Sequence, residues 1–400
     1  MILLEYYRRT GYRCMIKSYC LHTAEADDAA LAAADIMTQL EGVSLHKNSV
    51  GILACHYDFV KNGVVSALTA ALPFSVVGIT TFYQATEAAS GLFELTITLL
   101  TSDNVRFSLG HDNAVDDLPF NRIKNAYERG RTLCGEEPKA IFSFLSLYRP
   151  ISGDEFLRCL DEVSGGVPSF GAVTTGDDES GDNVYLICGD EVYTKGFALL
   201  LIAGDVTLDY YAASFLESHL LSMTGTVSRS EDTVVYELNG QPAGLFLTKQ
   251  GIALEESEMD KVSTVPYLIR MPGDEALTAR TLCGFNAEGA LYFMGDVPEG
   301  SLFRFGTVSA DDILNVSRAV TERAIEENSH AALLLMFSCV GRFITLGLES
   351  TAEMDHVKAV VPKGQPFLSC YAAGEICPVR KGGTYINRYH NSSFIVCALR

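Results

Sequence analysis

Near the C-terminus, an apolar run ends in side chains that could do chemistry. Residues 333–337 read LLLMF, and Ser338, Cys339 and Arg342 follow within five positions. A continuous apolar run predicts a buried strand, and strand ends are where layered α/β folds gather ligand-contacting groups. We therefore expect a hydroxyl, a thiol and a guanidinium at the end of one buried strand.

Two further polar pairs flank the strands that follow. Gly374-Glu375 comes after the next predicted strand, and His390-Asn391 precedes the last one. A guanidinium suits a carboxylate, and Glu375 could hold an ammonium. Arg342 and Glu375 would together bind the two charges of an α-amino acid; the alternative is that they pair with each other and close a structural loop. The predicted ligand-binding residues are Ser338, Cys339, Arg342, Gly374, Glu375, His390 and Asn391.

The same stretch contains the residue types of a thiol hydrolase. Cys339, His390 and Asn391 would serve as nucleophile, base and orienting group. Cys339 follows an apolar run, however, and a histidine and an asparagine adjacent in sequence rarely act in series. We expect no enzymatic activity and keep a thiol-dependent hydrolase using Cys339 as a minor alternative.

Metal and phosphate motifs are missing from the sequence. The eight histidines are dispersed, without an HxH or HxxxH pattern. Neither GxGxxG nor GxxxxGK[ST] occurs, so a glycine-rich phosphate loop is not indicated. We expect neither a metal nor a cofactor.

The composition is that of a globular protein with a strong negative charge. Hydrophobic residues make up 48% of the 400, and 50 acidic residues outweigh 30 basic ones to give a net charge of −20. This charge disfavours nucleic acid and anionic membrane surfaces as partners. No apolar run approaches the ~20 residues of a membrane helix, and the first residues lack a signal-peptide pattern. Because the eleven cysteines are scattered and form no CxxC pair, we expect reduced thiols and a cytoplasmic location.

A unit of strand, helix, strand and second long strand recurs three times. The first strands begin near Ile52, Ile141 and Leu333, and each is followed by a stretch with the apolar spacing of a helix. We expect a mixed α/β fold in which repeated β-α-β-β units form central sheets, packed face to face and flanked by helices. We favour two such sheets.

A different region separates the second and third copies. Asn239-Gly240 predicts the turn of a hairpin within residues 226–251, and residues 252–275 are a linker candidate. A helix is expected over 309–328, with Ser309 as its N-cap. This organisation predicts two domains, residues 1–255 and 256–400.

Motifs in both halves resemble the FIST family (F-box and intracellular signal transduction), with an N-terminal and then a C-terminal FIST domain. Their order and spacing span nearly the whole chain. The motifs are VVGITT (76–81), VVYELNGQPAG (234–244), VPEGSLFRF (297–305), FSCVGR (337–342), AAGEI (372–376) and YHNSSF (389–394).

The resemblance implies a bacterial sensory module that binds a small ligand, amino acids being the usual suggestion. We expect the signal to pass to a separate signalling protein; a protein-interaction scaffold without a small ligand is the alternative. One departure concerns the first copy, where the family's Gly-Glu pair is replaced by Tyr83-Gln84. A ligand contact from the first copy is therefore doubtful.

Overall fold

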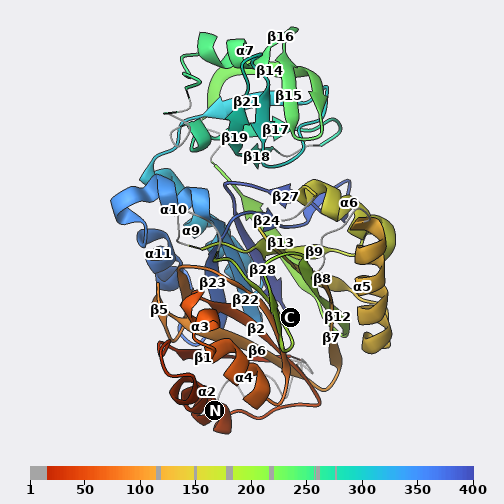
Figure 1. The fold of residues 1–400 in the computed structure, drawn as a ribbon, viewed down its shortest axis with the longest axis vertical. Helices are drawn as coiled ribbons and strands as arrows, with labels where there is room; N and C mark the ends of the chain where they lie inside the picture. Colours follow the sequence, from red (N-terminus) through yellow and green to blue (C-terminus); the bar gives the residue numbers. More distant parts are fainter. Residues whose placement is uncertain are drawn as a thin grey trace.

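The computed structural model describes residues 16–113, 119–147, 151–176, 183–215, 220–255, 257, 262–274 and 277–400. Three units of similar topology form a lower body, and residues 220–306 form a separate upper domain (Figure 1). The expected mixed α/β architecture with packed sheets and flanking helices is confirmed. The lower body has three sheets around one core, however, and not the two that we favoured.

Each unit begins with a strand and a helix that the sequence repeat did not include. The first unit contains β1 (Lys17–Thr23), α2 (Ala29–Glu41), β2 (Asn48–Cys55), α3 (Asp58–Lys61), α4 (Val64–Ala71), β3 (Ser75–Thr80) and β6 (Leu95–Ser102). The second contains β7 (Val105–Asp112), α5 (Pro119–Cys134), β8 (Ala140–Leu145), α6 (Gly153–Ser164), β9 (Ser169–Val173) and β12 (Phe197–Gly204). The third contains β13 (Leu208–Ala213), α9 (Ala310–Glu327), β22 (Leu333–Cys339), α10 (Val340–Leu346), η3 (Gly347–Glu349), α11 (Ala352–Val360), β23 (Phe367–Ala372) and β28 (Phe394–Leu399).

The strand order is the same in all three units. It runs β1-β6-β2-β3 in the first, β7-β12-β8-β9 in the second and β13-β28-β22-β23 in the third. In each unit, the third and fourth strands of this order are parallel to each other. The second strand, which is the last strand of the unit along the chain, is antiparallel to both of its neighbours. The expectation that strands at Ile52, Ile141 and Leu333 are equivalent, central and followed by helices is confirmed.

Short strands are exchanged cyclically between the units and complete each sheet. The first unit's β4 (Gln84–Thr86) and β5 (Ser90–Gly91) extend the third unit's sheet beside β23. The second unit's β10 (Leu186–Cys188) and β11 (Glu191–Tyr193) extend the first beside β3. The third unit's β24 (Glu375–Ile376) and β27 (Tyr389–His390) extend the second beside β9. A separate hairpin pairs β25 (Val379–Lys381) with β26 (Thr384–Ile386).

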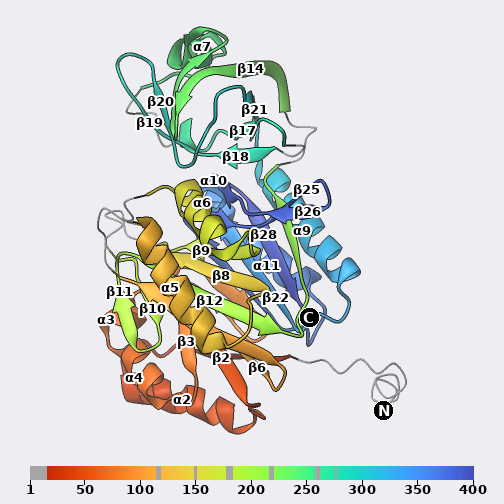
Figure 2. The ribbon, with the colours of Figure 1, turned by 90° about the vertical axis from the view of Figure 1, so that its right-hand side faces the viewer.

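The sheets are buried on both faces, which explains their continuous apolar runs. One face of every sheet packs into a common core that includes Ile52, Phe142 and Phe337. The other face packs against that unit's own helices, α2 and α4, α5 and α6, or α9 and α11 (Figure 2). Burying apolar side chains on both faces stabilises the strands and holds their ends in fixed positions.

The upper domain is inserted between β13 and α9 and has its own apolar core. It contains β14 (Leu220–Glu231), β15 (Val234–Leu238), β16 (Gln241–Pro242), α7 (Ala243–Lys249), β17 (Tyr267–Arg270), β18 (Thr278–Arg280), β19 (Leu282–Phe285), β20 (Leu291–Phe293) and β21 (Leu302–Gly306). Its sheet takes strands from both sides of residue 255. The compact structural unit is therefore residues 220–306.

Local sequence signals account for two features near this insertion. Asn239 and Gly240 both have positive φ and turn the chain between β15 and the short β16, whereas the longer hairpin of β14 and β15 turns at Asp232. Ser309 caps α9 as expected and forms a capping box with Asp312.

Candidate functional site

The polar residues singled out in the sequence lie at the end of β22 and in the chain around β24 and β27, where the lower body meets the upper domain (Figure 1). Ser338 and Cys339 close β22, which runs parallel to β23, so the chain leaving both strands emerges on the same side. Glu375 pairs with His390 across β24 and β27. The backbone N–H of Cys339 donates to the carbonyl of Ser393, which ties the last turn to β22.

Arg342 forms a buried ion pair with Glu353. Its Nη2 lies 2.7 Å and its Nε 3.0 Å from Glu353 Oε1, and the two side chains are 1% and 0% exposed. The second carboxylate oxygen, Oε2, accepts from the Ser338 hydroxyl at 2.7 Å. The alternative prediction, in which Arg342 and Glu375 form a structural ion pair, named the wrong carboxylate. Arg342 pairs with Glu353 of α11 and not with Glu375.

Arg342 also donates to groups other than Glu353. Nη2 donates to the carbonyl of Ile313 at 2.9 Å and to the hydroxyl of Ser317 at 2.8 Å, both on α9. Nη1 donates to the carbonyl of Ser214 at 3.1 Å. The guanidinium therefore joins α9, α10, α11 and the segment after β13.

Glu375 is fully buried but only half satisfied. Its Oε2 accepts from the backbone N–H of Ser393 at 3.3 Å, while Oε1 has no hydrogen-bond partner among the described residues. Burial raises the pKa of this carboxyl well above its usual range, and the nearby Glu353 adds to the effect, although Arg342 opposes it. Burial therefore favours the protonated form of this carboxyl.

Cys339 lies beside Glu375 in the same buried cluster. Burial raises the pKa of this thiol well above its usual range, and the negative potential of Glu375 raises it further. An ideal Cβ on Gly341 would lie 3.7 Å from the Cys339 sulfur, so the chain leaving β22 packs close over the thiol. The sulfur is held as a thiol and not as a thiolate.

The side chains of His390 and Asn391 have different surroundings. The Nε2 atom of His390 lies 3.1 Å from the carbonyl oxygen of Cys377, and burial lowers the pKa of this imidazole to about 4. Asn391 is 1% exposed, and its Oδ1 has no hydrogen-bond partner among the described residues. The cluster thus contains a second buried acceptor, in the turn that follows the residue paired with Glu375.

Gly374 has a packing role. A Cβ at this position would lie 2.1 Å from the hydroxyl of Tyr389, and one on Gly153 would lie 2.3 Å from the same ring. Both glycines therefore make room for the Tyr389 side chain, which is 1% exposed. The fixed ring sets the position of β27 and of the turn that carries Asn391.

Sequence reasoning missed three groups that complete the cluster. Glu353 was included only in an expected helix, although a carboxylate next to the apolar Met354 and Val357 signals burial of a charge. Ser317 and the Ser214 carbonyl come from distant segments, and no local pattern indicates them.

The upper domain contacts the site through its strand β18 and the residue after it. Arg280, 0% exposed, donates from Nη1 to the carbonyl of Tyr389 at 2.8 Å and from Nη2 to Asp154 at 3.1–3.2 Å. The hydroxyls of Thr281 and Ser392 lie 3.2 Å apart. The turn over Glu375 is therefore bonded directly to the upper domain.

Gln84 of the first unit, unlike Glu375 of the third, has hydrogen-bond partners for its side-chain amide. This side chain donates to the carbonyl of Glu94 and accepts from the Thr96 hydroxyl at 2.8 Å. Its amide is satisfied within the fold, which agrees with the doubt raised by the Tyr83-Gln84 departure. The second copy's Asp177 lies outside the described residues.

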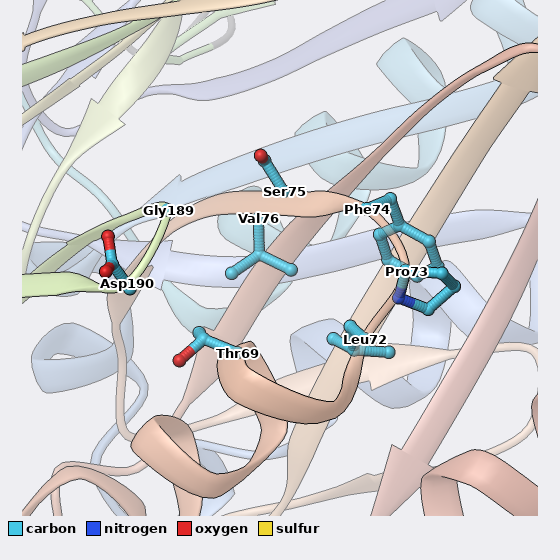
Figure 3. Close-up of a pocket in the computed structure, with 8 residues that line it drawn as sticks. All are labelled: Thr69, Leu72, Pro73, Phe74, Ser75, Val76, Gly189 and Asp190. Atoms are coloured by element: carbon cyan, nitrogen blue, oxygen red, sulfur yellow. The ribbon is translucent and has the colours of Figure 1, made fainter.

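A groove of about 340 Å³ lies elsewhere, at the amino end of β3 (Figure 3). It is open and contains none of the predicted site residues. Its lining residues are Thr69, Leu72, Pro73, Phe74, Ser75, Val76, Gly189 and Asp190. Among the described residues, no group of three or more His, Cys, Asp or Glu gathers to hold a metal ion.

The chain belongs to the FIST family. The FIST N domain matches residues 49–241 and the FIST C domain matches residues 247–378. FIST domains are sensory domains that bind small ligands in signal transduction. Within the described part of the chain, no helix is long and apolar enough to span a membrane.

Other comparisons are less informative. Comparison with curated proteins gave no match. Among solved structures, the cyanuric acid hydrolase from A. caulinodans is similar with a TM-score of 0.41 and 9% identity, over 96% of this chain and 99% of that chain.

Proposed function

We propose that this protein is a cytoplasmic bacterial sensory module that binds a small ligand, an amino acid, and relays the signal to a separate signalling protein. The observation that carries the proposal is the pair of buried oxygens without partners, Glu375 Oε1 and Asn391 Oδ1. Buried polar atoms are normally hydrogen-bonded, and an exception inside a polar cluster favours a missing ligand. The ammonium of an amino acid would donate to these oxygens.

The route to the signalling partner follows from the same contacts. The cluster is buried, so a ligand that enters it must displace neighbouring chain, and the turn 390–393 is bonded to Glu375 through the Ser393 N–H. That turn is bonded to Thr281 and, through Tyr389, to Arg280 of the upper domain. Because the upper domain has its own core, ligand binding would change how it sits on the lower body, and a partner that contacts both parts would detect the change.

We infer that Cys339 is not a catalytic nucleophile. Nucleophilic attack needs a thiolate, and both burial and Glu375 disfavour that form. The ring nitrogen Nε2 of His390 is engaged by the Cys377 carbonyl, so this atom is not directed at the thiol. Both points support a binding function over the hydrolase alternative.

Isothermal titration of the full chain with each of the twenty amino acids tests the proposal. We expect at least one to bind to the wild type, and Glu375→Gln and Asn391→Ala to weaken that binding roughly ten- to a hundred-fold. Glu349→Gln, which changes an exposed carboxylate on η3, is the matched control and should bind normally. Absence of binding across the panel, together with a stable co-purifying protein, would favour the scaffold.

A further inference from the structure

The buried cluster has one cation for two carboxyl groups. The positive charge of Arg342 is matched by Glu353 at 2.7 Å. Glu375 is close enough to feel both charges, but it has no cation of its own. An unpaired carboxylate is very costly to bury, so Glu375 must carry either a proton or a bound cation.

The hydrogen bonds of the cluster independently indicate that Glu375 needs a donor, either a proton or a bound cation. All three guanidinium nitrogen atoms of Arg342 already donate, to Glu353, Ser317 and the carbonyls of Ile313 and Ser214. The unsatisfied atoms of the cluster are oxygens, Glu375 Oε1 and Asn391 Oδ1. A ligand that completes this site must therefore donate hydrogen bonds.

We propose that the site recognises a primary amine, and that binding of the ammonium group displaces the proton of Glu375. This inference rests on the proposed function and specifies its ligand class: the amino group is required and the carboxylate is not. The exchange is balanced, because R–NH₃⁺ and the neutral carboxylic acid become an ammonium–carboxylate pair plus one proton released to solvent. The net charge of the cluster does not change.

The groups that face Glu375 from each neighbouring element are consistent with this exchange. Cys339 at the end of β22 remains a neutral thiol, and Arg342 and Glu353 cancel each other. The paired His390 is neutral because its pKa is lowered to about 4. The Ser393 N–H and the Cys339 thiol both donate to Glu375 and stabilise the ionised carboxylate once an ammonium is present. No other group of the cluster needs to change its charge.

Matched ligands test the proposal in the wild-type protein. Alanine is compared with ethylamine and propionate, and leucine with 3-methylbutylamine and 4-methylpentanoate, by titration calorimetry. We expect the amine of a pair to bind within about tenfold of its amino acid, and the acid not to bind. Repeating the titrations in phosphate and in Tris, which differ in ionisation enthalpy, should show release of about one proton per amine bound.

Three results separate this inference from the proposed function. Binding of amino acids and acids without amines would overturn the inference and leave the proposed function standing. Amine binding without proton release would overturn the exchange with Glu375. If no compound of either set, nor any other amino acid, binds, both proposals fail. The Glu375→Gln variant should bind the amine with roughly ten- to a hundred-fold weaker affinity, and its binding should release no proton.

Discussion

Glu353 and Arg342 form an ion pair within the packing of α9, α10 and α11, with 2.7 Å between Oε1 and Nη2 and almost no exposure of either side chain. The pair lies beside Glu375, a carboxyl whose pKa is raised well above its usual range by burial. A structural cation and a free carboxyl thus occur in one cluster, and they give opposite expectations for mutation.

Arg342→Ala should strongly destabilise the fold. The substitution leaves Glu353 buried without its cation, which typically costs about 3–5 kcal/mol of unfolding free energy. Urea denaturation measures the loss, and the control is Lys124→Ala, which removes an exposed pair with Glu128 and should cost at most about 0.5 kcal/mol. A fully stable Arg342→Ala protein that has lost amino-acid binding would instead make Arg342 a ligand residue.

Glu375→Gln should retain stability at neutral pH and change its pH dependence. The folded-state pKa of Glu375 lies well above the unfolded value of 4.5, so the native state binds the extra proton in between. The contribution of Glu375 to the unfolding free energy therefore falls as pH rises from 4.5 towards the folded pKa, by up to about 1.4 kcal/mol per pH unit. Denaturation curves measured across this pH range give the unfolding free energy of both proteins. With rising pH, this free energy should decrease less, or increase more, in Glu375→Gln than in the wild type. Identical slopes would mean that Glu375 is ionised in the native protein.

His390 should give a pH dependence of opposite sign. Its pKa is about 4 in the folded protein and 6.5 when unfolded, so the unfolded state binds more protons between these values. Neutral His390 contributes about 3 kcal/mol to the unfolding free energy above pH 6.5. This contribution is lost as pH falls towards 4. His390→Gln should remove that loss in acid denaturation, and an unchanged acid limb would refute the assignment.

The cysteines should differ sharply in reactivity. The ten described cysteines are free, as expected, and Cys14 lies outside the described residues. Cys55, Cys188 and Cys397 are buried in strands, and burial raises the pKa of Cys188 to about 12. Among the described thiols, the exposed Cys283 should react first with a thiol reagent without denaturant. Mass-spectrometric mapping that finds Cys55 or Cys397 labelled as rapidly would show that the core opens readily.

Asp154→Ala should loosen the upper domain. The change removes the carboxylate from the buried Arg280, whose other bonds hold the carbonyls of Tyr389 and Asp296. We expect faster hydrogen exchange at residues 278–281 and 389–393, with little change in the separate core of the upper domain. Arg158→Ala, which removes a 61% exposed partner of Asp296, is the control. Equal exchange in both variants would argue against this contact as the attachment point.

The sequence by itself determined the first strand of each repeated unit and the helix and strand that follow it. Continuous apolar runs define β2, β8 and β22, since strands buried on both faces need them, and the polar residues after β22 do gather at one end of the lower body. The family motifs lie elsewhere as well: one in β3, two around β15 and β21 of the upper domain, and three around β22, β24 and β27.

Tertiary structure decided which charges meet. The partner of Arg342 is Glu353 because α11 packs against α9 and brings it within reach, while Glu375 belongs to β24, which pairs with β9 of another unit. The third sheet and the cyclic exchange of short strands likewise depend on contacts between distant segments. Local patterns record which residues are buried, but the partner of a buried charge is chosen by long-range packing, because only neighbours in space relieve the cost of its desolvation.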